Sequence, residues 1–258
     1  MTRFAQALRA EWLKIFTTKT WWILTLIMVV YLGFTALLLG ATLSTVEADP
    51  IMVYTTASTI GFIFPLLLGT LAVTGEFRHH TIIPTFLTVP KRGLVLAAKL
   101  LVHFVLGAAM GVIAFATTIG AGAFFFSGQT GLDQAETWQI IGRCLLVMAL
   151  WAAVGVGVGS LVPNQAAALV VVIGFTQFLE PTLRLVAAVQ ENLAPIGKFL
   201  PGAASDALGG ASFYSSFSSM TGSGAATGLL WWQAGLVFLG YGALAVGLGY
   251  WLRWRRGV

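Results

Sequence analysis

The sequence predicts an all-α membrane protein with six transmembrane helices. Of its 258 residues, 58% are hydrophobic and only 9% are charged. This is too little charge to cover a water-soluble globule, so the bilayer must surround most of the chain. The run 51–75 contains no Asp, Glu, Lys or Arg, and it is long enough to cross a bilayer as a helix. The chain length allows about five to seven such crossings.

Six apolar runs define the expected spans. They cover approximately 20–43, 51–75, 97–126, 138–161, 166–189 and 229–252. The fourth and fifth lie within one uncharged stretch, 144–179, that is too long for a single crossing. Pro163 and Asn164 supply a break there, which predicts a tight helical hairpin. No polar stretch is long enough for a soluble domain, so we expect residues 1–258 to form one transmembrane domain.

Residues 2–16 predict an amphipathic helix that precedes the first span. Apolar side chains recur at helical spacing along one arc, at Phe4, Leu8, Trp12 and Ile15. Polar and basic side chains take the other arc, at Arg3, Gln6, Arg9 and Lys14. This pattern is typical of a helix in the headgroup layer, with a simple positively charged flank as the alternative. A cleaved signal peptide fits poorly, because the apolar run that follows is far longer than a signal core.

The basic residues predict the orientation of the spans. With six spans and an inner N-terminus, all but three of the 14 Lys and Arg residues fall on the inner side. The exceptions are Arg143, Arg184 and Lys198. Basic residues concentrate on the cytoplasmic side of membrane proteins. We therefore expect a multi-pass protein of the inner (cytoplasmic) membrane with both termini in the cytoplasm.

The inner connection between the second and third spans, residues 76–92, has the composition of a docking surface. Pro84 and Pro90 argue against one straight helix through it. Its apolar residues can form a central plug, and they are Ile82, Ile83, Phe86 and Leu87. Basic residues near its two ends can form a rim, and they are Arg78, Lys91 and Arg92. Glu76 begins the segment and is also a candidate docking residue. An apolar centre inside a polar rim is typical of a protein interface.

The outer connection, residues 190–228, is too rich in Pro, Gly and Ser to span the membrane, yet it keeps apolar residues such as Phe199 and Phe213. A loop of this length is usually functional or partly embedded. Glu180 and Arg184 lie four residues apart near the outer end of the fifth span. Ionisable groups at that depth are costly and usually functional, although the two can also simply neutralise each other. These four residues are our candidate outer gate.

Several chemical signatures are missing from the sequence. It contains no phosphate-binding loop, no G-x-S-x-G, no H-E-x-x-H and no Cys/His cluster at zinc spacing. We therefore expect no ATP hydrolysis by this chain alone, and no catalytic, cofactor or metal site. Nucleic-acid binding is also disfavoured, because the basic residues sit in short clusters between apolar runs.

Two weaker groups of ionisable residues have simple explanations. Glu76, His79 and His80 could contribute to a metal site or a proton relay, but a charged cluster that flanks the membrane explains them better. His103 and Arg143 lie within a few residues of span ends. We expect both side chains to snorkel towards the membrane surface.

Five short segments resemble a known family. They are EWLK at 11–14, TTKTWW at 17–22, EFRH at 76–79, PKRG at 90–93 and AAKL at 97–100. Their order and spacing resemble the permease subunits of type-2 ABC transporters, especially short actinobacterial ones. The resemblance implies an interfacial "elbow" helix at 2–16, a coupling segment at 76–92 that docks on a separately encoded ATPase, and short re-entrant helices within 190–228. One departure is His80, where relatives often have glycine.

The resemblance also implies partners and a mechanism. A second permease copy, identical or paralogous, would complete the membrane part, and the ATPase subunits would hold ATP and Mg. The apolar character of the spans favours export of an amphipathic or hydrophobic substrate, such as a drug, lipid or peptide, by alternating access. An ion-coupled secondary transporter is the alternative, although Glu180 is the only carboxylate that it could use. An intramembrane enzyme is a weaker alternative, because His103 has no visible partner in the sequence.

Overall fold

The structure is a computed structural model that describes residues 3–43, 49–81, 84, 91–126, 131–190, 192–210 and 229–254. Over these residues it consists of helices and contains no strand. Within these described ranges, six helical segments are long and apolar enough to cross a membrane. The predicted fold class, an all-α protein with six transmembrane helices, is therefore confirmed.

The spans have the following bounds. The first three spans are α2 (Thr20–Leu43), the short helices α3 (Ile51–Tyr54) and α4 (Thr56–Thr59) continued by α5 (Ile63–Arg78), and α7 (Arg92–Gly122). The fourth is α8 (Ala135–Leu161), and the fifth runs through α9 (Gln165–Ile173), a π-helical turn η2 (Gly174–Leu179) and α10 (Glu180–Val189). The sixth is α14 (Trp231–Gly249), which a second π-helical turn, η3 (Tyr250–Trp254), extends. Helix α1 (Arg3–Thr17) precedes the spans, and α11 (Ala194–Gly197) and α12 (Pro201–Gly209) follow the fifth.

Helix α8 forms the centre of the bundle. In its most apolar stretch 72% of the residues are buried, against 11% for the sixth span. Glycines allow its neighbours to approach closely: a Cβ atom on Gly155 would collide with the carbonyl oxygen of Leu66 in α5, and one on Gly107 in α7 would collide with the carbonyl oxygen of Met148. Small residues at such crossings are the usual way for membrane helices to gain packing contacts.

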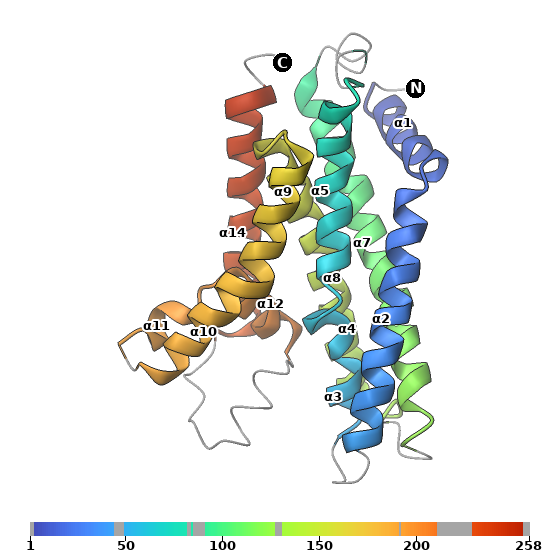
Figure 1. The fold of residues 1–258 in the computed structure, drawn as a ribbon, viewed down its shortest axis with the longest axis vertical. Coiled ribbons are helices and arrows are strands. Elements are labelled where there is room, and N and C mark those ends of the chain that lie inside the picture. Colours follow the sequence, from blue (N-terminus) through green and yellow to red (C-terminus); the bar gives the residue numbers. More distant parts are fainter. Residues whose placement is uncertain are drawn as a thin grey trace.

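Both ends of the described chain lie at the same end of the bundle, as an even number of spans requires (Figure 1). Helix α1 lies there too, beside the start of α7 and the end of α5 (Figure 1). The segment 76–92 connects α5 to α7 at this same end. One end of the molecule therefore gathers the N-terminal helix, the predicted docking segment and the end of the last span.

At the opposite half of the bundle, α10 slants away from the other helices, and α12 turns back against α8 and α14 (Figure 1). Ala204 and Leu208 of α12 are buried there. The residues between the fifth and sixth spans therefore include a helix that packs within the bundle.

Candidate functional site

The face that helix α1 turns towards the bundle coincides only in part with the predicted apolar arc, with which it shares Ile15. Its buried residues are Ala7, Glu11 and Ile15, which follow one another at intervals of four and so form one stripe. Leu8 and Trp12 from the expected apolar arc are only half-buried beside this stripe. The stripe is centred on a carboxylate that is 2% exposed. A buried acid needs partners, and two lysines, Lys14 and Lys99, supply them.

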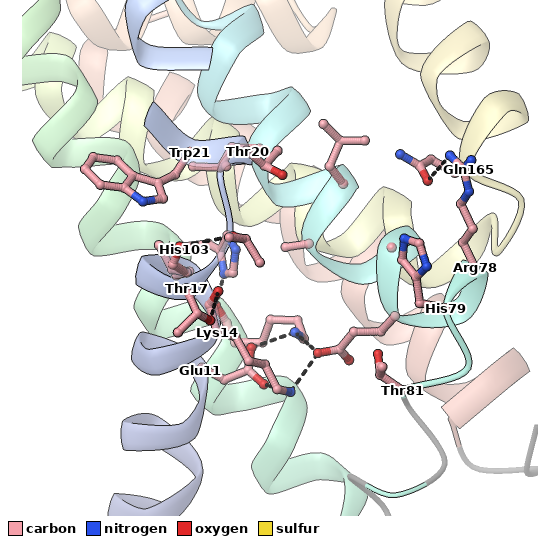
Figure 2. A pocket seen from close by; sticks show the side chains of 18 residues that line it. Glu11, Lys14, Thr17, Thr20, Trp21, Arg78, His79, Thr81, His103 and Gln165 are labelled. Atoms are coloured by element: carbon pink, nitrogen blue, oxygen red, sulfur yellow. Dashed lines mark hydrogen bonds and ion pairs between the residues drawn. The ribbon is translucent and has the colours of Figure 1, made fainter. Parts of the chain in front are cut away.

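Four charged side chains form a closed cluster between α1, α5 and α7. The ammonium group of Lys99 donates to Glu11 Oε2 at 2.6 Å and to Glu76 Oε1 at 2.9 Å. The ammonium group of Lys14 donates to Glu11 Oε1 at 2.7 Å and to the same Glu76 Oε1 at 2.7 Å. Figure 2 shows these contacts as dashed lines around Glu11 and Lys14. Two positive and two negative charges alternate, so the ion cluster is neutral as a whole.

The two lysines differ in exposure. The side chain of Lys99 is 1% exposed, whereas that of Lys14 is 36% exposed. Lys99 is therefore a fixed internal counter-ion, while Lys14 closes the cluster from its accessible side. His103, one turn after Lys99, is also buried, and its Nδ1 lies 2.8 Å from the Lys99 carbonyl oxygen. The expectation that the His103 side chain snorkels to the membrane surface is wrong, because the residue is enclosed among the helices and only 1% exposed.

Ionisation within the cluster follows from burial and charge together. Burial disfavours the charged form of Glu11, but the Lys99 and Lys14 charges outweigh it and hold the pKa of Glu11 below its ordinary value. Burial likewise opposes the charge on Lys14, and Glu76 and Glu11 outweigh it, so the pKa of Lys14 is raised. Each shift favours the charged form, so both groups are ionised at neutral pH.

A cavity of about 520 Å³ lies beside the ion cluster. Its polar lining includes the whole cluster together with His103, Arg78 and Gln165 (Figure 2). Its apolar lining is Ile15, Trp21, Leu68, Leu71 and Ala72. The cavity is therefore bounded by α1, the start of α2, α5, α7 and the first residue of α9.

Helix α5 ends at Arg78, two residues after Glu76, in a left-handed turn. The amide of Thr81 donates to the Glu76 carbonyl oxygen at 3.0 Å, and the amide of His80 donates to the Phe77 carbonyl oxygen at 3.3 Å. This pair of bonds defines a Schellman motif, whose left-handed residue is His80 with φ of 55°. Glycine adopts this backbone without strain, so the geometry explains why a glycine would suit the position of His80.

The other residues predicted for docking divide into two groups. Arg78 donates to the Gln165 side chain at 3.2 Å, and Arg92 donates to the Trp254 carbonyl oxygen at 2.7 Å. Lys91 is exposed just before α7. The predicted plug lies outside the described residues, and its members are Ile82, Ile83, Phe86 and Leu87. Among the residues that the structure does describe, no three His, Cys, Asp or Glu side chains gather as a metal site would require.

A family model described as "ABC-2 family transporter protein" matches residues 7–181. The chain belongs to the ABC-2 transporter family. The match extends from α1 to the first residues of α10 and so contains every member of the ion cluster. The resemblance to type-2 ABC permeases is thereby confirmed, and this ABC-2 permease is a membrane subunit of a transporter and not itself an ATPase. No curated protein matched the sequence.

In this permease, Glu180 and Arg184 of the candidate outer gate have further partners in α12, which the sequence did not reveal. The Glu180 carboxylate accepts hydrogen bonds from the amides of Gly202 and Ala203 and pairs with Arg184 at 3.3 Å. Arg184 also donates to Asp206 at 2.8 Å. Glu180 thus supplies the negative charge that the start of α12 favours, and the pair does more than neutralise itself.

The structure describes one of the two aromatic members of the candidate outer gate. Phe199 is 43% exposed, and its carbonyl oxygen accepts a hydrogen bond from the Tyr241 hydroxyl at 2.9 Å. Phe213 lies outside the described residues. A gating role for Glu180, Arg184, Phe199 and Phe213 stays a prediction.

Proposed function

We propose that this ABC-2 permease couples ATP hydrolysis by a separate ATPase subunit to the export of an amphipathic or hydrophobic substrate. It would act with a second permease copy, identical or paralogous, and with ATPase subunits that hold ATP and Mg. Residues 76–92 would dock on the ATPase. The permease would then alternate between inward-facing and outward-facing states within the lipid bilayer.

One observation carries the coupling proposal: both ends of the segment 76–92 are tied to other parts of the bundle. Glu76 at one end belongs to the ion cluster with α1 and α7. Arg92 at the other end is bonded to the backbone at the end of the last span. Packed interiors transmit displacement because they compress little. A push on this segment would therefore move α1, α7 and the last span together.

The ion-coupled alternative has little support in the described residues. Such a transporter needs an intramembrane carboxylate that can exchange a proton or a cation. Glu180 is committed to two backbone amides and an arginine. The charge of Glu76 is already neutralised by Lys14 and Lys99 of the chain itself, so this acid requires no proton or metal cation.

We further propose that the end of the bundle with α1 and both termini faces the cytoplasm, in the inner membrane. The excess of basic residues predicted for this side supports the assignment. A cysteine introduced at exposed His79, in a Cys144→Ser background, should not react with an impermeant thiol reagent added to intact cells, whereas one at exposed Asp133 should. Labelling of the first and not the second would reverse the orientation.

The coupling proposal is tested by a double substitution, Phe86→Asp with Leu87→Asp. It places two charges in the predicted plug, and truncating interface hot spots costs about 2 kcal/mol or more of association each. The variant should reach normal levels in the membrane, because the change lies in a connection outside the spans. It should lose the co-expressed cognate ATPase in pull-downs and lose transport.

The matched controls are the single substitutions Arg78→Ala and Lys91→Ala. A charge on the rim of an interface mainly sets the rate of encounter and its salt dependence, so both variants should retain the ATPase at low salt. If the double variant keeps full ATPase binding and transport, the docking surface lies elsewhere, and α1 becomes the next candidate.

A further inference from the structure

The cavity beside the ion cluster contains a carboxylate pair that is short of one positive charge when Lys14 is left out. Glu11 and Glu76 carry two negative charges, and the buried Lys99 compensates only one of them. The remaining charge is balanced by Lys14, whose side chain is the exposed member of the cluster. The pair therefore has the charge of a site for one further ammonium group, and the chain's own lysine fills it.

The hydrogen-bonding capacity of the pair is not exhausted by Lys14. Glu76 Oε1 accepts from both lysines, while the other oxygen, Oε2, is buried and has no hydrogen-bond partner among the described residues. Glu76 as a residue is only 7% exposed. An unpaired buried carboxylate oxygen is costly, since it keeps its desolvation penalty without compensation. A primary ammonium group has three donors, enough to serve Glu11 Oε1 and both oxygens of Glu76.

The rest of the cavity selects the body attached to such an ammonium group. Aliphatic and aromatic side chains form one wall, with Trp21 at the start of the first span and Leu68 on α5. Figure 2 shows Trp21 and Thr20 on one side of the cavity and Glu11 and Lys14 on the other. A volume of about 520 Å³ lies within the usual range of small-molecule sites. An apolar body of moderate size therefore fits beside the charged group.

We propose that this cavity binds a primary ammonium group on an apolar body, and that the group displaces Lys14 from the carboxylates of Glu11 and Glu76. Lys14 is then a tethered competitor, which keeps the buried acids neutralised while the site is free. Two sources offer this chemistry: the headgroup of an aminophospholipid and a free amphiphilic amine. The binding step needs no ATPase, so the proposal can be tested separately from coupling.

The test measures binding of n-octylamine to the full-length chain in phosphatidylcholine nanodiscs, by calorimetry, with empty nanodiscs subtracted. The reference probe is octyltrimethylammonium, which has the same charge and tail but no N–H donor. Because octylamine can donate hydrogen bonds to the carboxylates and the reference probe cannot, the native chain should bind octylamine at least about tenfold more tightly than the reference probe.

The deciding variant is Lys14→Met, which keeps the apolar stem and removes the competing ammonium group. It should bind octylamine at least about tenfold more tightly than the native chain, because no internal charge has to be displaced. Lys19→Met is the matched control, since Lys19 is exposed and does not line the cavity. The affinity of this control should equal that of the native chain.

The two sources are separated by repeating the titration in phosphatidylethanolamine nanodiscs. A weaker octylamine affinity there assigns the site to the lipid headgroup, and an unchanged affinity assigns it to free amines. The proposal is overturned if octyltrimethylammonium binds the native chain as tightly as octylamine. It is also overturned if a folded Lys14→Met variant gains no affinity, and the native-chain comparison decides alone if that variant does not fold.

Discussion

Replacing Lys99 should destabilise the packing of α1, α5 and α7 at the end of the bundle that carries the predicted docking segment. Lys99 is 1% exposed and contacts both acids of the ion cluster at 2.6 Å and 2.9 Å. In Lys99→Met the two carboxylates share Lys14 alone, so one negative charge stays buried without compensation. Breaking a buried ion pair from one side costs about 3–5 kcal/mol. We expect a loss of that size in the free energy of unfolding.

A double-mutant cycle isolates the interaction itself. Glu11→Gln alone leaves an excess positive charge, but combined with Lys99→Met it restores neutrality with Lys14 and Glu76. The double variant should therefore be more stable than the sum of the single losses predicts, by about 2 kcal/mol. Unfolding in mixed micelles with rising dodecyl sulfate, followed by circular dichroism, measures each value.

The control for this cycle is Lys19→Met, which removes an exposed lysine and should change stability by less than about 0.5 kcal/mol. A loss of less than about 1 kcal/mol in the free energy of unfolding for Lys99→Met would contradict the reasoning, since an unpaired buried carboxylate should destabilise the fold by more than that. A coupling energy near zero would show that the two residues do not interact in the membrane.

Three other predictions follow from the structure. The contribution of Glu11 to the free energy of unfolding should be complete above its ordinary pKa of 4.5 and be lost as the pH falls through its lowered pKa, whereas that of Lys14 should be complete below its ordinary pKa of 10.5 and be lost as the pH rises through its raised pKa. Unfolding measured across the pH range should show a loss of stability at both ends, and Glu11→Gln should reduce the loss at acidic pH. Gly155→Ala should destabilise the bundle by about 1–3 kcal/mol in the same unfolding assay because it forces α8 away from α5, while Gly142→Ala, which meets no neighbour within 4 Å, should be neutral or stabilising. His80→Gly should raise stability by about 1 kcal/mol in thermal unfolding because it relieves a left-handed backbone, and an unchanged midpoint would refute the strain.

The number and type of the spans could be predicted because apolar run length is a local property of the sequence. The ion cluster could not, because its members come from three helices and Glu11 lies 88 positions from Lys99. A signal was nonetheless present: Glu11 falls between Ala7 and Ile15 at helical spacing, and an acid inside a buried stripe requires a basic partner. Lys99 is a candidate for that partner because it lies inside the expected third span, but its charge serves there only to predict the orientation of the spans.

The outer half of the bundle shows a second limit of sequence reasoning. Glu180 and Arg184 were recognisable as a pair because they are four residues apart on one helix. Asp206 and the start of α12 were not, since they lie in a stretch too polar and too rich in glycine to be read as a buried helix. The interactions that place α12 join residues about one helix length apart in sequence, and only the folded chain brings them together.

The ion cluster also determines the order in which the helices can assemble in the membrane. Glu11 leaves the ribosome 88 residues before Lys99, so the third span, which carries its buried partner, is not yet in the bilayer when the first two spans enter. Until the third span arrives, the N-terminal helix must stay where water can solvate its carboxylate. Lys99 in turn enters the membrane as an expensive charge until it meets that carboxylate. Docking of the first helix is therefore a late step of biogenesis, and it completes only when the third span has been inserted at the correct depth.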